Sequence, residues 1–177
     1  MDLQDIKTPG LSCDLHDNPD IKERELALSH KILMSVEKPA RYIGGESGSV
    51  IKDKEKVSVR FAFCFPDSYD IGMSHLGMKI LYSLTNQREA YWCERVFAPG
   101  IDFEEIMRRE NIPLYALESL DPVKDFDFIG FTMQYELSYT NVLNMLDLAG
   151  LPVFAKDRGD ELFNIVVAGG PLSLIHI

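Results

Sequence analysis

The alternation of strand-like and helix-like segments is the feature that most constrains how this chain can fold. Apolar runs that are typical of buried strands occur at 57–65, 91–98, 126–133 and 164–168. Between them, residues 74–85, 103–110 and 138–148 have the spacing of amphipathic helices. Strands that alternate with helices predict a parallel sheet with helices on both faces, joined by right-handed crossovers. We therefore expect an α/β fold.

The strand pattern also predicts the core and the helix starts. We expect 57–65 and 126–133 to be parallel strands that are adjacent or one strand apart, with an exposed edge at the last strand. Ser74 and Asp102 are suitable N-caps for two of the helices, and residues 114–117 could form a short edge strand. The side chains that we expect to be most buried are Phe61, Phe63, Phe65, Ile129, Phe131, Val166 and Val167.

The first 55 residues carry no clear strand pattern. Residues 1–20 lack periodicity and are interpreted as a loop or disordered tail, whereas the spacing in 21–36 predicts a helix. The stretch 40–49 (ARYIGGESGS) is glycine-rich and must be a loop, either a flexible connector or a contact loop for a partner domain. We thus divide the chain into a tail (1–20), a helix with a glycine-rich loop (21–55) and an α/β domain (56–171).

Composition excludes several classes of protein. The 28 acidic and 18 basic residues give a net charge of −10, which argues against a nucleic-acid-binding surface. No apolar run reaches the roughly 18 to 20 residues of a membrane span, and no secretory signal is visible, so we expect a cytoplasmic protein. The three cysteines, Cys13, Cys64 and Cys93, lack the spacing of a metal or cluster site. We expect Cys64 and Cys93 to be small buried side chains.

The loops that follow the strands are the candidate site. Parallel sheets bind ligands in the crevice beyond the carboxyl ends of their strands. This directs attention to 67–77, 132–138 and 169–170. Gly72 and Gly77 would be there for backbone reasons, either a close approach or an unusual φ. The candidate cofactor-binding residues are Asp67, Ser68, Gly72, Ser74, His75, Gly77, Thr132, Gln134, Glu136, Gly169 and Gly170.

Five stretches together resemble one family of proteins. They are RYIGGE (41–46), FPDSYDIGMSHLGMKILY (65–82), ERVFAP (94–99), 130–152 and VVAGGP (166–171). This set of sequence motifs resembles radical SAM proteins whose N-terminal region is similar to a cobalamin-binding domain. The resemblance implies a flavodoxin-like or Rossmann-like domain ahead of a barrel-like catalytic domain. That second domain would hold a [4Fe–4S] cluster on a C-x-x-x-C-x-x-C motif and cleave S-adenosylmethionine.

The cysteine motif of that family is not in this chain. We therefore expect the chain to be the front part of a larger enzyme, with no catalytic residue of its own and the catalytic domain as its partner. The sheet would then be incomplete at its C-terminal side. Residues 172–177 (LSLIHI) read as the translation of a sequencing adapter and are expected to be a non-native tail; a genuine apolar terminus is the alternative.

The cobalamin motif is matched only in part. The resemblance implies cobalamin as the cofactor, with D-x-H-x-x-G after the first strand, S-x-L after the third and two glycines after the fourth. His75 is present, but Met73 replaces the aspartate and Gly77 comes one place early; residues 132–134 replace S-x-L, and only 169–170 fits well. His75 could cap a helix, contact a ligand or bind cobalt.

Two functions remain open from the sequence. The chain is either a cofactor-binding or substrate-access domain of a radical SAM enzyme, or a non-catalytic interaction domain that kept the fold without the cofactor. A flavin binder and a phosphorylatable receiver are disfavoured, the receiver because residues 132–134 supply no aspartate at the end of the third strand.

Overall fold

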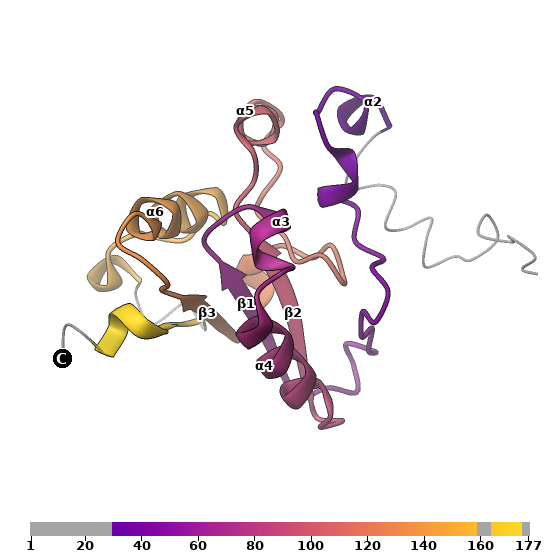
Figure 1. Cartoon of the computed structure of the whole chain (residues 1–177), viewed down its shortest axis with the longest axis vertical. Helices are drawn as coiled ribbons and strands as arrows, with labels where there is room; N and C mark the ends of the chain where they lie inside the picture. Colours follow the sequence, from indigo (N-terminus) through magenta and orange to yellow (C-terminus); the bar gives the residue numbers. More distant parts are fainter. Residues whose placement is uncertain (1–29, 159–163, 175–177) are drawn as a thin grey trace, which may run out of the picture.

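The computed structural model describes residues 30–158 and 164–174, and within them a four-stranded parallel sheet forms the centre of the molecule (Figure 1). Its strands are β1 (Val59–Phe65), β2 (Tyr91–Phe97), β3 (Phe128–Thr132) and β4 (Ile165–Gly169). They lie in the order β2-β1-β3-β4, and every pairing is parallel. The predicted adjacency of 57–65 and 126–133 is confirmed, since β1 pairs directly with β3. The α/β prediction is also confirmed.

The helices connect these strands. They are α2 (His30–Leu33), α3 (Tyr69–Gly72), α4 (Leu76–Asn86), α5 (Ile101–Glu110) and α6 (Ser138–Leu148), with short 3-10 turns η1 (Pro39–Arg41), η2 (Val123–Asp125), η3 (Ala155–Asp157) and η4 (Pro171–Leu174). The crossover through α4 leads from β1 to one side of the sheet, and the crossover through α6 leads from β3 to the other. Right-handed connections therefore place α4 and α6 on opposite faces. No helix in the described ranges is long and apolar enough to cross a membrane.

Both predicted N-caps were wrong. Helix α4 begins at Leu76 and is capped by His75, whose Nδ1 accepts the amide hydrogen of Met78 at 3.1 Å. Ser74 does not cap α4 because its hydroxyl donates to the Asp70 carbonyl at 2.9 Å. Asp70 belongs to α3, which occupies the predicted loop. Helix α5 begins at Ile101 after Gly100. The Asp102 carboxylate instead accepts the amide hydrogen of Glu37 at 2.8 Å, which ties α5 to the N-terminal segment.

Two other predicted elements also differ. Helix α2 ends at Leu33 rather than at residue 36, while residues 1–29, including the predicted tail and most of the predicted helix, lie outside the described residues. Residues 114–117 are buried and form one isolated antiparallel bridge, between Tyr115 and Pro122, instead of an edge strand. The Leu117 amide donates to the Arg95 carbonyl at 2.9 Å, so this segment covers the outer edge of β2.

The core lies mainly around β1, β2 and β3, which is buried from Ile129 onward. Of the side chains predicted to be most buried, Phe63, Phe65, Ile129 and Phe131 are, and so are Cys64 and Cys93. Phe61 and Val166 are half-buried, and Val167 is 43% exposed, so the prediction for Val167 was wrong. The reason is the position of β4, which among the described residues pairs only with β3.

Helix α4 buries a different face from the one that its leucine spacing suggests. It packs over β2, and its buried side chains are Met78 and Tyr82. Four apolar side chains of the helix remain about half exposed or more: Leu76, Ile80, Leu81 and Leu84. Val167, Gly130 and Phe61 lie together on the sheet, where a Cβ at Gly130 would contact both neighbours.

Candidate functional site

The loops after β1 and β3 meet at the carboxyl edge of the sheet, as the sequence predicts. The strand order reverses direction between β1 and β3, which is the position where parallel sheets open a crevice. The Tyr135 hydroxyl donates to Asp67 Oδ2 at 2.5 Å, and Asn141 Nδ2 donates to the Pro66 carbonyl at 2.9 Å. Two loops that are separated by more than 60 residues are thus joined directly.

The predicted residues after β1 are held by contacts within the chain. Asp67 Oδ1 accepts the Ser68 amide hydrogen at 2.7 Å, so both carboxylate oxygens have partners, and Ser68 precedes α3 as its N-cap residue. Gly72 packs against the sheet, because a Cβ there would lie 2.2 Å from the Phe97 ring. A Cβ at Gly77 would meet the His75 ring at 3.0 Å. Neither glycine has a positive φ, so that part of the prediction was wrong.

His75 acts as a helix cap. Its Nδ1 accepts the Met78 amide hydrogen, and its ring lies 5.2 Å from that of Phe65. An accepting Nδ1 carries no proton, so the neutral ring has its hydrogen on Nε2. A histidine that binds a metal through Nε2 requires the opposite tautomer, with a hydrogen on Nδ1 donated to a neighbour. His75 therefore does not fit a cobalt ligand while it caps α4.

The predicted residues after β3 and β4 have different surroundings. Thr132 is buried, and its hydroxyl accepts a hydrogen bond from Gln134 Nε2, whereas Glu136 is exposed. Gly170 has a φ of +117°, and a Cβ there would lie 2.6 Å from the Met133 carbonyl oxygen. Gly169 has open space around its Cβ position. Gly170 is thus required by the backbone itself, and Gly169 is the position with room for another group.

An apolar patch at this carboxyl edge was missed by the sequence reasoning. We define the carboxyl-edge patch as five side chains on the segments that follow β1 and β3: Ile71 (53% exposed), Leu76 (69%), Tyr135 (40%), Leu137 (78%) and Tyr139 (43%). Large apolar side chains in such numbers at one edge are typical of an interaction surface. The signal in the sequence was the presence of large apolar residues in these segments, whose polar residues and glycines alone were predicted to form the site.

The glycine-rich loop is fixed against the domain along the β2 side of the sheet (Figure 1). We call residues 41–50 the clasp segment. The Tyr42 ring stacks on Phe103 with centroids 4.1 Å apart, its hydroxyl accepts the Gly100 amide hydrogen at 3.1 Å, and its carbonyl accepts from the Tyr115 hydroxyl at 2.9 Å. Gly44 has a φ of +65°, and a Cβ there would lie 2.1 Å from the Leu117 carbonyl oxygen. The RYIGGE stretch therefore packs on this chain, and the interpretation as a flexible connector was wrong.

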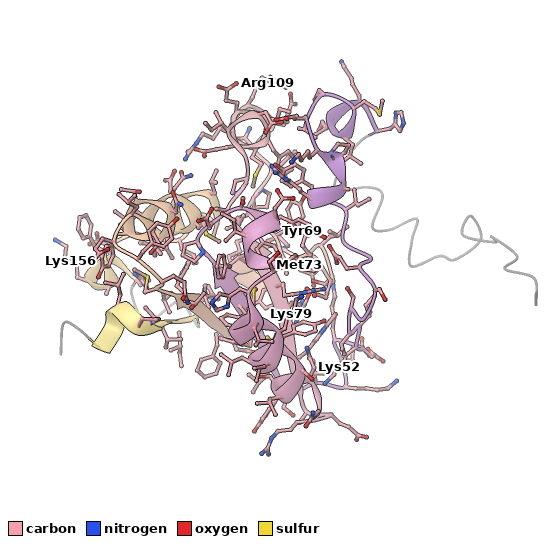
Figure 2. The ribbon with its side chains drawn as sticks, in the orientation of Figure 1. Lys52, Tyr69, Met73, Lys79, Arg109 and Lys156 are labelled. Carbon is pink, nitrogen blue, oxygen red and sulfur yellow. The ribbon has the colours of Figure 1, made fainter. Side chains whose placement is uncertain are left out.

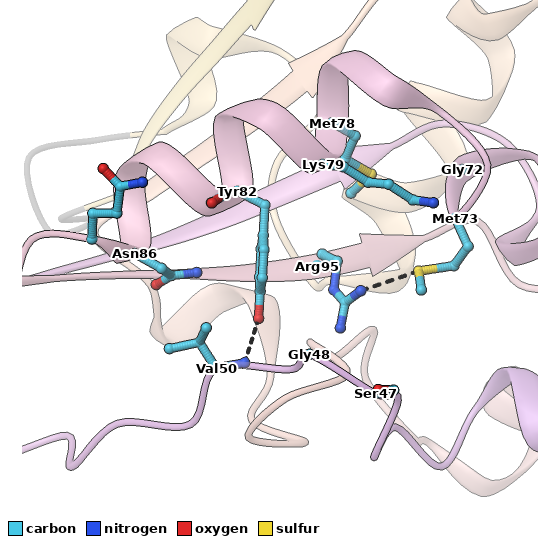
Figure 3. A pocket seen from close by; sticks show the side chains of 12 residues that line it. Ser47, Gly48, Val50, Gly72, Met73, Met78, Lys79, Tyr82, Asn86 and Arg95 are labelled. Carbon is cyan, nitrogen blue, oxygen red and sulfur yellow. Dashed lines mark hydrogen bonds between the residues drawn. The ribbon is translucent and has the colours of Figure 1, made fainter.

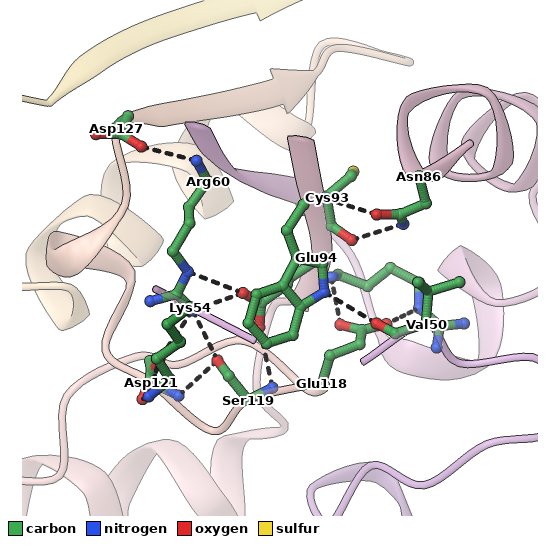
Figure 4. Close-up of polar contacts among 12 residues, drawn as sticks. Val50, Lys54, Arg60, Asn86, Cys93, Glu94, Glu118, Ser119, Asp121 and Asp127 are labelled. Carbon is green, nitrogen blue, oxygen red and sulfur yellow. Dashed lines mark hydrogen bonds and ion pairs between the residues drawn. The ribbon is translucent and has the colours of Figure 1, made fainter. Parts of the chain in front are cut away.

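Two buried ion pairs lie beside the clasp segment (Figure 4). Glu94 is fully buried, accepts from Arg60 Nη2 at 2.5 Å and also accepts the Ser119 amide hydrogen at 2.9 Å. Arg95 Nε donates to Glu118 Oε1 at 2.5 Å. Burial raises the pKa of the Glu94 and Glu118 carboxyls, against the opposing effect of their arginine partners. These groups join β1 and β2 to the loop after residue 117.

A cavity of about 500 Å³ opens on the other side of the clasp segment, between it and α4 (Figure 3). Gly72 is the predicted site residue that lines it. Met73 follows Gly72 at the end of α3 and lines the same space, as does Lys79 of α4; both residues are labelled in Figure 2. The predicted crevice and this cavity thus share only the end of α3.

A comparison with known protein families assigns the chain. The family described as radical SAM proteins, N-terminal, matches residues 77–176, which is 100 of the 177 residues. The chain belongs to this family. The match runs from the start of α4 through β4 and so includes three of the four strands. No curated protein and no solved structure gave a match. Within this radical SAM family, the cobalamin-binding similarity of the N-terminal region remains a prediction.

Proposed function

We propose that this N-terminal region of a radical SAM protein is an interaction domain that docks the catalytic domain of the same protein on its carboxyl edge. The observation that carries the proposal is the carboxyl-edge patch, in which five large side chains are at least 40% exposed. Two domains are held firmly together only where their interface is large and apolar, and exposed apolar side chains on fixed loops supply such a surface. The hydrogen bonds of Tyr135 and Asn141 hold those loops in place.

The polar groups of the crevice favour docking over a cofactor site. Asp67 uses both carboxylate oxygens, Thr132 its hydroxyl and His75 its Nδ1 on neighbours in the chain. A ligand with a polar nucleotide tail would have to replace those bonds. Cobalamin binding, which the family resemblance implies, would rest on Gly169 and its open surroundings rather than on His75.

The docking proposal predicts a difference in hydrogen–deuterium exchange. Backbone amides of 69–77 and 133–139 should exchange more slowly in a longer protein that joins this region to a radical SAM domain than in the 177-residue chain. Burying the patch excludes water from these loops and suppresses local opening. The double substitution Leu76→Asp and Leu137→Asp should remove that protection, because it places two charges in the interface.

A matched control comes from the same helix. Leu84 is 54% exposed near the opposite end of α4, and Leu84→Asp should leave the protection of both loops intact. Equal exchange of the loops in the short and the long protein would show that the carboxyl edge is not covered by the catalytic domain.

The capping role of His75 gives a second prediction. The change His75→Ala should lower the free energy of unfolding by about 0.5 to 2 kcal/mol, whereas His75→Asn should retain most of it, since asparagine is a favoured N-cap. Urea unfolding followed by circular dichroism measures both. Hydroxocobalamin should give the same absorbance spectrum when it is added to the parent protein and to the His75→Asn variant. An absorbance change that occurs with the parent and is lost in His75→Asn would identify His75 as a cobalt ligand and contradict the capping assignment.

A further inference from the structure

The cavity beside α4 has the size and lining of a small-molecule site. Its volume of about 500 Å³ falls within the range of roughly 300 to 1,000 Å³ that such sites occupy. Apolar side chains, Met73, Met78 and Val50, and the Tyr82 ring form part of the wall. The Val50 amide donates to the Tyr82 hydroxyl at 2.7 Å, which closes the wall between α4 and the clasp segment (Figure 3).

The charge of the lining is opposite to that of the chain. Arg95 and Lys79 both line the cavity, and among the described residues no aspartate or glutamate does, although Glu46 Oε2 lies 3.4 Å from Arg95 Nη2. Because Arg95 is paired with Glu46 and Glu118, the positive charge of Lys79 is the one that favours an anion in the cavity.

Arg95 is positioned as a directional donor. Its Nε is bound to Glu118, its Nη2 donates to Ser49 Oγ at 2.8 Å, and its guanidinium carbon lies 4.6 Å from the centre of the Tyr82 ring. Nη1 donates to the Met73 thioether sulfur at 3.2 Å, and a thioether is a weak acceptor. An anionic oxygen at that position would accept a much stronger, charge-assisted hydrogen bond.

Lys79 supplies the charge that Arg95 does not. The charge of Arg95 is opposed by two carboxylates, Glu118 at 2.5 Å and Glu46 at 3.4 Å, so its attraction for a further anion is reduced. Lys79 is exposed on α4, and its side chain extends along the cavity toward Met73 (Figure 3). A head group between Lys79 Nζ and Arg95 Nη1 would therefore meet one strong charge and one fixed donor.

We propose that this cavity binds a small organic anion, with a carboxylate or phosphate head group between Lys79 and Arg95 and an apolar body against Met73, Met78 and Tyr82. The lining of this site includes no residue of the carboxyl-edge patch, and the site does not depend on the docking proposal. The lining accounts for both parts of such a ligand, because it contains two cations, Lys79 and Arg95, together with apolar side chains.

Nuclear magnetic resonance titration of the 177-residue protein tests the site. Phenyl phosphate and benzoate are the two anionic probes, and phenol is the neutral probe of the same body. At least one anion should shift the backbone amides of Met73, Lys79 and Arg95 in a saturable way, with a Kd of about 1 mM or tighter. Comparing the two anions separates a phosphate site from a carboxylate site. Phenol should give no saturable shift.

The variant Lys79→Gln should weaken anion binding about tenfold, because it removes the unopposed charge while leaving an exposed, helix-compatible side chain. Lys38→Gln is the matched control, since Lys38 is exposed and does not line the cavity. Its affinity should equal that of the parent. Absence of saturable shifts with either anion, or equal affinity for the Lys79→Gln and parent proteins, would overturn the proposal.

Discussion

Replacing Glu94 with alanine should lower the free energy of unfolding by about 3 to 5 kcal/mol. The Glu94 side chain is fully buried, and it accepts hydrogen bonds from Arg60 and from the Ser119 amide. Its removal leaves the Arg60 guanidinium in a site that is only 12% exposed, near the rings of Trp92 and Phe126, with Asp121 at 2.8 Å as its remaining carboxylate partner. Urea unfolding monitored by circular dichroism would measure the loss.

The double variant Arg60→Met and Glu94→Leu should recover a large part of that stability. Burial raises the pKa of the Glu94 carboxyl even beside Arg60, so the burial of this carboxylate carries a desolvation cost. Replacing both charges removes the desolvation cost along with the attraction. If the double variant were as unstable as Glu94→Ala, the ion pair itself would be the main source of stability, contrary to this account.

Replacing Phe103 with alanine should also cost about 3 to 5 kcal/mol. Phe103 is 1% exposed on α5, stacks on Tyr42 and meets the edge of the Tyr115 ring at 6.3 Å between centroids. The change opens a void beneath the clasp segment and removes a stacking partner, so thermal and urea unfolding should both shift to lower values.

Ile101 offers a control two residues earlier on the same helix. It is 80% exposed, and Ile101→Ala should change stability by no more than about 0.5 kcal/mol. Similar values for the two variants would mean that α5 is not packed on the clasp segment in solution.

The strands and the parallel pairing of β1 with β3 could be predicted because each strand carries its own pattern, whereas the full order β2-β1-β3-β4 was not predicted. The stretch VRFAFCF predicts a buried strand because its phenylalanine side chains are apolar and are stabilised by removal from water. The helices between the strands indicate parallel pairing. Val167 was assigned wrongly although an exposed edge was expected at the last strand, because its apolar run is identical in kind to that of a central strand and the pattern does not show which side chains of an outer strand stay uncovered. Sequence pattern reports what can be buried, not what is covered.

The helix starts depended on contacts that local sequence does not contain. Ser74 has a better capping side chain than His75, but the unpredicted helix α3 engages it first. Asp102 is likewise taken by the Glu37 amide, 65 residues away. Such competition between a local cap and a distant partner is decided by the tertiary fold.

The site was predictable in position and not in composition. A parallel sheet fixes the loops after β1 and β3 at one edge, so 67–77 and 132–138 could be singled out. The bond between Tyr135 and Asp67 and the exposure of Leu137 arise only after the loops meet. The cavity was missed because its wall combines α4, Arg95 of β2 and the clasp segment, whose residues share no motif.

The clasp segment also constrains the order in which the domain folds during synthesis. Its contacts join Val50 to Tyr82 and Tyr42 to Tyr115, which are 32 and 73 residues further along the chain. During synthesis the segment leaves the ribosome well before these partners exist, and contacts of such long separation form slowly. Residues 41–50 therefore cannot form all of these contacts until Tyr115 has been synthesised. Until then the outer edge of β2 is exposed and can pair with other chains.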